Sequence, residues 1–116
     1  MDVDAVTADL HAAAAAGHPL TYAEVLNGQG LAFSRPKMRA LCKLLDHIDT
    51  AERGVGRPAL AVLVVRASDG LPGQGWWIAE SSRGAYAGPW LGLQAAAHIA
   101  AAHAAVFDWW ATATPR

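Results

Sequence analysis

Residues 34–66 read SRPKMRALCKLLDHIDTAERGVGRPALAVLVVR, and this stretch decides the fold that the sequence predicts. Its first part favours a helix, because Ser34 is a good N-cap and Pro36 is tolerated in the first turn. The helix should run to about Arg53, just before two closely spaced glycines. Its apolar residues recur at spacings of three or four, which predicts one apolar stripe along the helix. The stripe consists of Met38, Leu41, Leu45 and Ile48.

The same stretch concentrates the positive charge of the chain. It holds seven of the nine Lys and Arg residues and three acids, which gives +4, whereas the whole chain has a net charge of −1. Arg35, Arg39 and Lys43 recur every four residues and therefore share a second face of the helix. A helix of this kind can pack on a core with one face and present charge with another, which favours a nucleic acid as the partner.

The second part of the stretch predicts a buried strand. Residues 60–65 form a short apolar run, rich in valine, between Pro58 and a Ser-Asp-Gly turn sequence. Residues 76–79 (WWIA) are the expected partner strand, in which alternation would turn one of the two tryptophans inward. Residues 67–75 contain the glycines and the proline that are typical of a long hairpin loop. We therefore expect a two-stranded hairpin.

Two helices are expected before this stretch. The first covers about residues 4–16 and ends at Gly17-His18-Pro19. Thr21-Tyr22-Ala23-Glu24 matches the capping box, in which the Thr and Glu side chains bond to backbone amides at a helix start. A short second helix should follow and turn Tyr22 inward, and Asn27-Gly28-Gln29-Gly30 should end it.

The last helix is expected from Trp90 to about Thr112, with Pro89 in its first turn. Most of its residues are alanine, so it has little charge on any side. A helix this apolar is normally covered on more than one side, and in so small a protein the cover can be a second copy of the chain. We therefore predict a homodimer through this helix. Its interface would include Trp90, Phe107, Trp109 and Trp110.

The length of 116 residues indicates a single domain. We expect an N-terminal helix within residues 1–18, a helix-turn-helix and hairpin within residues 20–80, and an added Ala- and Trp-rich helix within residues 89–113. Helix, helix, helix, strand, loop and strand is the order of a winged helix-turn-helix, with the hairpin as the wing. The predicted fold class is therefore α+β, in the winged helix-turn-helix form.

The chain resembles bacterial winged helix-turn-helix DNA-binding domains over roughly residues 20–80. The likeness is carried by Thr21–Val25, by the basic helix, by Leu60–Arg66 and by the loop Gly70-Leu71-Pro72-Gly73-Gln74-Gly75 before Trp76. The same loop is similar to segments of small uncharacterised bacterial and phage-type proteins. The resemblance implies that the third helix enters the DNA major groove and that the wing flanks it.

A second resemblance is to the DNA-binding part of alkylguanine-DNA alkyltransferases, which also place a Tyr-x-x-(Val/Ile) helix before a basic helix. The reactive Pro-Cys-His-Arg motif of that family is absent here. The single cysteine, Cys42, lies inside the predicted third helix instead. Alkyl transfer is therefore not expected, and we expect Cys42 to be a buried, inert thiol.

Seven residues are candidates for DNA contact. Arg35 and Arg39 would reach guanine edges, and Lys43 would meet a phosphate. Arg66, at the end of the strand, and Gln74, in the wing, would touch an adjacent groove or the backbone. The full predicted set is Ser34, Arg35, Lys37, Arg39, Lys43, Arg66 and Gln74.

Other chemistry has no support in the sequence. The five histidines are scattered and no cysteine or acid cluster completes a metal set, so we predict no metal. The acids are dispersed and no serine has the context of a nucleophile, so we predict neither an enzyme nor a cofactor. A lone cysteine and the absence of a long apolar run favour a cytoplasmic protein that does not cross a membrane.

The leading hypothesis is a small bacterial or mobile-element transcription regulator that binds double-stranded DNA. The alternative is a protein-interaction module of the same fold, such as an immunity, antitoxin or phage-type inhibitor protein. Five tryptophans and a nearly neutral total charge favour this alternative. A protein partner is therefore kept open beside DNA.

Overall fold

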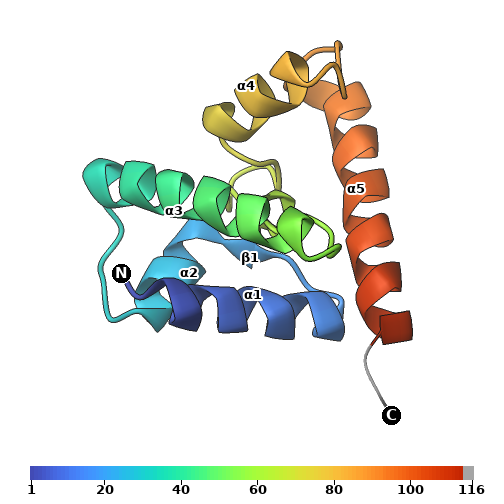
Figure 1. Ribbon diagram of the computed structural model, residues 1–116. Helices are drawn as coiled ribbons and strands as arrows, with labels where there is room; N and C mark the ends of the chain where they lie inside the picture. Colours follow the sequence, from blue (N-terminus) through green and yellow to red (C-terminus); the bar gives the residue numbers. More distant parts are fainter. Residues whose placement is uncertain (114–116) are drawn as a thin grey trace.

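The computed structural model describes residues 1–113, which form a mainly helical α+β protein (Figure 1). Within these residues there are five α-helices, one 3-10 helix (η1) and two strands of two residues each. In chain order they are α1 (Val3–Ala16), β1 (Leu20–Thr21), α2 (Tyr22–Gly28), α3 (Arg35–Gly54), η1 (Ala61–Leu63), β2 (Val64–Val65), α4 (Gln74–Ser82) and α5 (Gly92–Ala113).

The first three helices form close to where the sequence predicts them, and a side chain caps the start of each. The Asp2 carboxylate accepts from the first-turn amides of α1. The capping box of α2 is complete: the Glu24 amide donates to the Thr21 hydroxyl, and the Thr21 amide donates to the Glu24 carboxylate. The Ser34 hydroxyl accepts from the Lys37 amide at 3.2 Å and starts α3. The predicted helix starts are therefore confirmed.

The predicted hairpin is wrong. β2 pairs with β1, not with residues 76–79, and the two strands run parallel, with Leu20 opposite Val64 and Thr21 opposite Val65. Residues 61–63 form η1 instead of extending the strand. All five residues 61–65 are buried. The apolar run therefore reflects complete burial, which periodicity alone cannot assign to a strand.

Residues 76–79 belong to α4, so the second strand of the expected wing is a helix. Trp77 and Glu80 are buried three residues apart, which is helical spacing, whereas Ile78 between them is 51% exposed. The indole N–H of Trp77 donates to the carbonyl of Pro72 at 3.1 Å and fixes this side of α4. Tertiary packing thus overrides the β-propensity of two tryptophans and an isoleucine.

The core lies between α1, α2 and α3 on one side and α5 on the other, around η1 and β2. Figure 1 shows α5 running across the ends of the other helices. Its buried residues are Ala95, Ile99 and Val106, at spacings of four and seven, so only one face of α5 joins the core. No helix among the described residues is both long enough and apolar enough to span a membrane.

A single buried hydrogen bond ties α2 to the loop before α4. The Tyr22 hydroxyl accepts from the Gly73 amide at 2.8 Å, although the two residues are 51 positions apart. A Cβ atom at position 73 would lie 3.0 Å from this hydroxyl, so glycine leaves the space that the contact needs. Burial raises the pKa of Tyr22 to about 12 and outweighs the opposite effect of the Gly73 amide.

We expect Tyr22→Phe to lower the free energy of unfolding by about 1–3 kcal/mol, because the buried Gly73 amide loses its acceptor. The wild-type chain should also lose stability above pH 10, the ordinary Tyr pKa, as pH rises toward about 12. The sign follows because a raised folded-state pKa favours the native state only while the phenol stays protonated. Urea unfolding at neutral and alkaline pH measures both effects, and Tyr22→Phe should lack the alkaline component.

Candidate nucleic-acid interface

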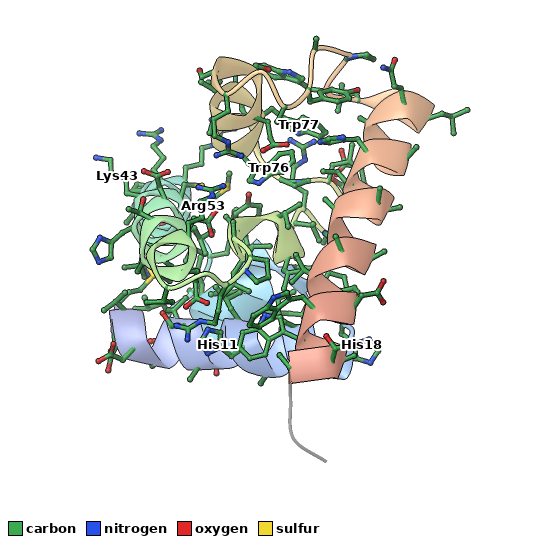
Figure 2. All side chains as sticks on the ribbon, turned by 45° about the vertical axis from the view of Figure 1, so that its right-hand side comes forward. His11, His18, Lys43, Arg53, Trp76 and Trp77 are labelled. Carbon is green, nitrogen blue, oxygen red and sulfur yellow. The ribbon has the colours of Figure 1, made fainter. Side chains whose placement is uncertain are left out.

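The charges of α3 are sorted by sign between its two faces. Asp49 and Glu52 are buried, with 5% and 2% of their surface exposed. The cations Arg35, Arg39, Lys43 and Arg53 are exposed, with Asp46 as the one exposed acid on this helix. Figure 2 shows Lys43 reaching outward from α3. We call these four exposed cations the basic face.

Helical geometry places the four cations on one side of α3. At 3.6 residues per turn, the step from Arg35 to Arg39 or from Arg39 to Lys43 rotates the direction by roughly 40°. Arg53 lies 18 residues after Arg35, which is about five full turns, so it returns to the same direction. Arg53 was not among the predicted contact residues, although its spacing from Arg35 is visible in the sequence.

The exposed cations of α3 form no ion pairs within the described part of the chain. Within residues 1–113, neither the basic face nor Lys37 has a carboxylate within 4.0 Å. The three other arginines of this part of the chain are all paired. Their pairs are Arg57 with Glu52, Arg66 with Asp69, and Arg83 with Glu80.

The two buried acids orient α3. The Asp49 carboxylate accepts from the amides of Leu60 and Ala61 at 2.8 and 2.9 Å, which ties α3 to the start of η1. The Glu52 carboxylate contacts His11 of α1 at 3.1 Å and accepts from Arg57 at 2.6 Å. These contacts tie α3 to η1 and to α1, and its basic face stays exposed.

The two carboxyl groups have opposite pKa shifts. Burial raises the pKa of Asp49, and the two backbone amides reverse only part of this effect. For Glu52, burial also acts to raise the pKa, but the hydrogen bonds from Arg57 and His11 prevail and lower it. Glu52 is therefore stabilised as an anion, whereas Asp49 is a buried acid without a cation in contact.

The seven predicted DNA-contact residues do not form one surface. Arg35, Lys37, Arg39 and Lys43 share α3, although Lys37 is half-buried. The hydroxyl of Ser34 is used as the helix cap. The side chains away from α3 differ from expectation: Arg66 bonds to Asp69 at 2.9 and 3.2 Å, and Gln74 begins α4 instead of standing in a hairpin loop.

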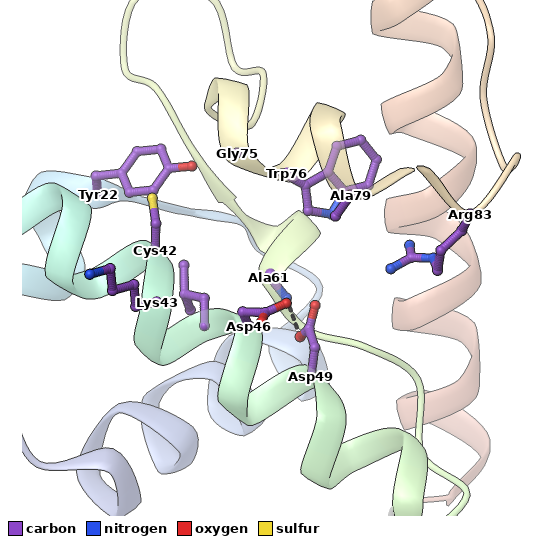
Figure 3. Close-up of a pocket in the computed structure, with 11 residues that line it drawn as sticks. Tyr22, Cys42, Lys43, Asp46, Asp49, Ala61, Gly75, Trp76, Ala79 and Arg83 are labelled. Atoms are coloured by element: carbon purple, nitrogen blue, oxygen red, sulfur yellow. Dashed lines mark hydrogen bonds between the residues drawn. The ribbon is translucent and has the colours of Figure 1, made fainter. Parts of the chain in front are cut away.

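A cleft of about 290 Å³ opens between α3 and α4, beside the basic face (Figure 3). Lys43 belongs to both, since it is exposed on α3 and also lines the cleft. Sequence reasoning missed this cleft because its second wall is α4, where a strand was expected. The other main lining residues are Tyr22, Cys42, Asp46, Asp49, Trp76 and Arg83.

The residues predicted for a dimer interface are largely used within the chain. Trp90, Phe107 and Trp110 are partly buried against the core. The ring of Trp110 lies 4.6 Å from that of His11 in α1, and Trp109 stacks edge-on against Trp110 at 5.2 Å. The side of α5 that faces away from the core carries mainly exposed alanines. The homodimer therefore stays a prediction.

Three of the five histidines connect elements of the fold. His11 contacts Glu52, as described above. His98 of α5 contacts the Glu80 carboxylate of α4 at 3.1 Å. His103 of α5 contacts the carbonyl of Val62 in η1 at 2.6 Å. These polar contacts supplement the single apolar face with which α5 joins the core.

We expect Cys42 to react slowly with a thiol reagent at pH 7.5. Burial raises the pKa of this thiol and outweighs a hydrogen bond from Tyr22 that favours the thiolate, so little of the reactive anion is present. The measurement is the rate of labelling by Ellman's reagent, with the guanidinium-unfolded chain as the control. Labelling of the folded chain faster than the unfolded control would contradict this prediction.

Comparison of the chain with models of known families, with curated proteins and with solved structures gave no match. A proposal about function therefore depends on the geometry and charge of α3 and its neighbours.

Proposed function

We propose that the chain binds double-stranded DNA through the basic face of α3 and acts as a small transcription regulator. The observation that carries this proposal is the set of exposed, unpaired cations on one firmly held helix. A DNA duplex has about one negative charge for every 1.7 Å of its length. Cations that form no ion pair with an acid are available to replace the counterions of such a duplex.

The dimensions of α3 suit the major groove. The helix has 20 residues, which corresponds to a length of about 30 Å. It follows the short helix α2 after a turn, which is the order of helix-turn-helix proteins, and in these the second helix enters the groove. On this proposal, Arg35 and Arg39 read guanine edges, and Lys43 and Arg53 bind phosphates.

The segment after β2 contributes less to this proposal than the sequence suggested. Arg66 is neutralised by Asp69, and α4 replaces the hairpin that would lie along an adjacent groove. Recognition would therefore rest on α3 alone within one copy of the chain. With a net charge of −1 for the chain, non-specific affinity for DNA should be modest and should fall steeply with salt.

The test is a fluorescence-anisotropy titration with labelled genomic fragments at several salt concentrations. We expect Arg39→Ala combined with Lys43→Ala to weaken binding and to reduce the salt slope by about one for each lost phosphate contact. Arg39→Ala alone is matched by Arg83→Ala, which removes the same charge from an arginine already paired with Glu80. The control should bind as the wild type does. Equal losses in the two single variants would contradict a role for the basic face.

A protein partner is the second candidate, and exposed apolar side chains favour it. Ile78 of α4 is 51% exposed, and Leu91 and Leu93 at the start of α5 are 63% and 91% exposed. Side chains of this kind are common in protein contacts when they lie together. Co-purification of a partner protein would select this candidate over DNA if the complex persists after nuclease treatment and at high salt. Leu93→Ser should weaken that complex.

A further inference from the structure

The cleft between α3 and α4 has the properties of a small-ligand site. Its volume of about 290 Å³ is close to the lower end of small-molecule pockets, which is about 300 Å³. Its floor and walls come from separate elements: Tyr22 of α2, residues 42–49 of α3, Ala61 of η1 and residues 75–79 of α4. A ligand here would contact four elements at once.

A buried carboxylate in this cleft has an unused acceptor. Both backbone amides that reach Asp49 donate to its Oδ1 atom. No described residue donates to Oδ2 within hydrogen-bond distance. In Figure 3 one carboxylate oxygen of Asp49 points from α3 toward α4, into the space below Trp76. Oδ2 is not among the buried unpartnered atoms of the described chain, so it is open to the cleft, where the N–H group of a ligand can donate to it.

The wall opposite Asp49 is aromatic. Trp76 lines the cleft and is only half-buried. Its ring is held edge-on against Trp77, with the ring centres 4.9 Å apart, so the ring is already fixed in position. Nucleobases stack on aromatic side chains of this kind, and the stacking depends little on which base it is.

The open edge of the cleft is positive. Lys43 lines the cleft and forms no ion pair in the described chain, and in Figure 3 its ammonium group points outward, away from Asp49 and Trp76. Arg83 points into the cleft in Figure 3 but is bonded to Glu80. Asp46 is the one exposed acid among the lining residues. The lysine side chain is flexible and carries a compact charge, so it can turn to meet a phosphate at this edge, which lysine binds as a point charge.

We propose that this cleft binds a nucleotide whose base carries an exocyclic amino group. The amino group donates to Oδ2 of Asp49, the base stacks on Trp76, and the phosphate pairs with Lys43. The chemistry is the same for a free mononucleotide and for an unpaired nucleotide of a strand. The site is separate from the basic face apart from Lys43, so it does not depend on duplex binding.

The test is a calorimetric titration of the full chain with AMP, with indole signals in nitrogen-edited NMR as a second readout. We expect saturable binding below roughly 1 mM. Purine riboside 5′-monophosphate, which lacks only the amino group, should bind about tenfold more weakly or worse. Adenosine should also bind more weakly than AMP, and Lys43→Ala should remove that difference.

Two matched variants locate the site. Ala79→Leu fills the wall of the cleft and should abolish AMP binding, whereas Ala96→Leu on the exposed side of α5 should leave it unchanged. Asp49→Asn should weaken AMP binding while its amide oxygen still accepts from η1. Circular dichroism identifies any variant that fails to fold. If a variant does not fold, the difference in affinity between AMP and purine riboside 5′-monophosphate, measured on the wild-type chain, tests the proposal instead.

A short oligodeoxyadenylate distinguishes the two sources of ligand. If the chain binds the oligonucleotide but not AMP, and if Ala79→Leu abolishes this binding, the site takes an unpaired nucleotide of a strand. If the chain binds AMP, the site takes a free nucleotide. The proposal is overturned if neither ligand binds below roughly 1 mM, if Ala79→Leu binds normally, or if the phosphate without the amino group binds equally well. Binding of duplex DNA is measured separately with Arg39→Ala. If the chain does not bind duplex DNA, the measurement of AMP binding in the cleft still tests this proposal.

Discussion

The hydrogen bonds from the amides of Leu60 and Ala61 to the buried carboxylate of Asp49 are the constraint on which the rest of this structure depends. They turn an acid of α3 inward and satisfy the first backbone amides of the segment that enters the core. Glu52, one turn later, is also turned inward, toward His11 and Arg57. With two of its three acids in the interior, α3 exposes four cations and one acid, Asp46, to the solvent.

The same arrangement explains why two candidate sites lie next to each other. α4 lies across a cleft from the side of α3 that holds Cys42 and Asp49, while the residues of the basic face stay exposed. Lys43 lies where the two meet. A phosphate bound in the cleft and a DNA phosphate would therefore compete for one ammonium group, which gives a small domain a simple means to couple a nucleotide to its affinity for DNA.

Local signals in the sequence predicted much of the fold, and packing decided the remainder. The capping box at Thr21, the cap at Ser34 and the stripe of α3 depend on residues within one or two helical turns, and all three were predictable. The WWIA sequence at residues 76–79 was misassigned, because burial of Trp77 against Tyr86 and the core selects a helix there. The spacing of four between Arg39 and Lys43 predicted that these two side chains share one face of α3. The inward turn of Asp49 was not predictable, since it depends on amides 11 and 12 residues away.

The parallel pairing of β1 with β2 has a further consequence for the proposed binding of DNA by α3. β1 directly precedes and β2 directly follows residues 22–63, which contain α2, α3 and η1. The pairing of the two strands therefore holds the two ends of this segment together. Together with the Asp49 and Glu52 contacts, this pairing leaves α3 little freedom to tilt. A preorganised helix loses little entropy on binding, but it cannot follow the groove. Selectivity would then depend partly on how readily a given duplex bends or widens to meet it.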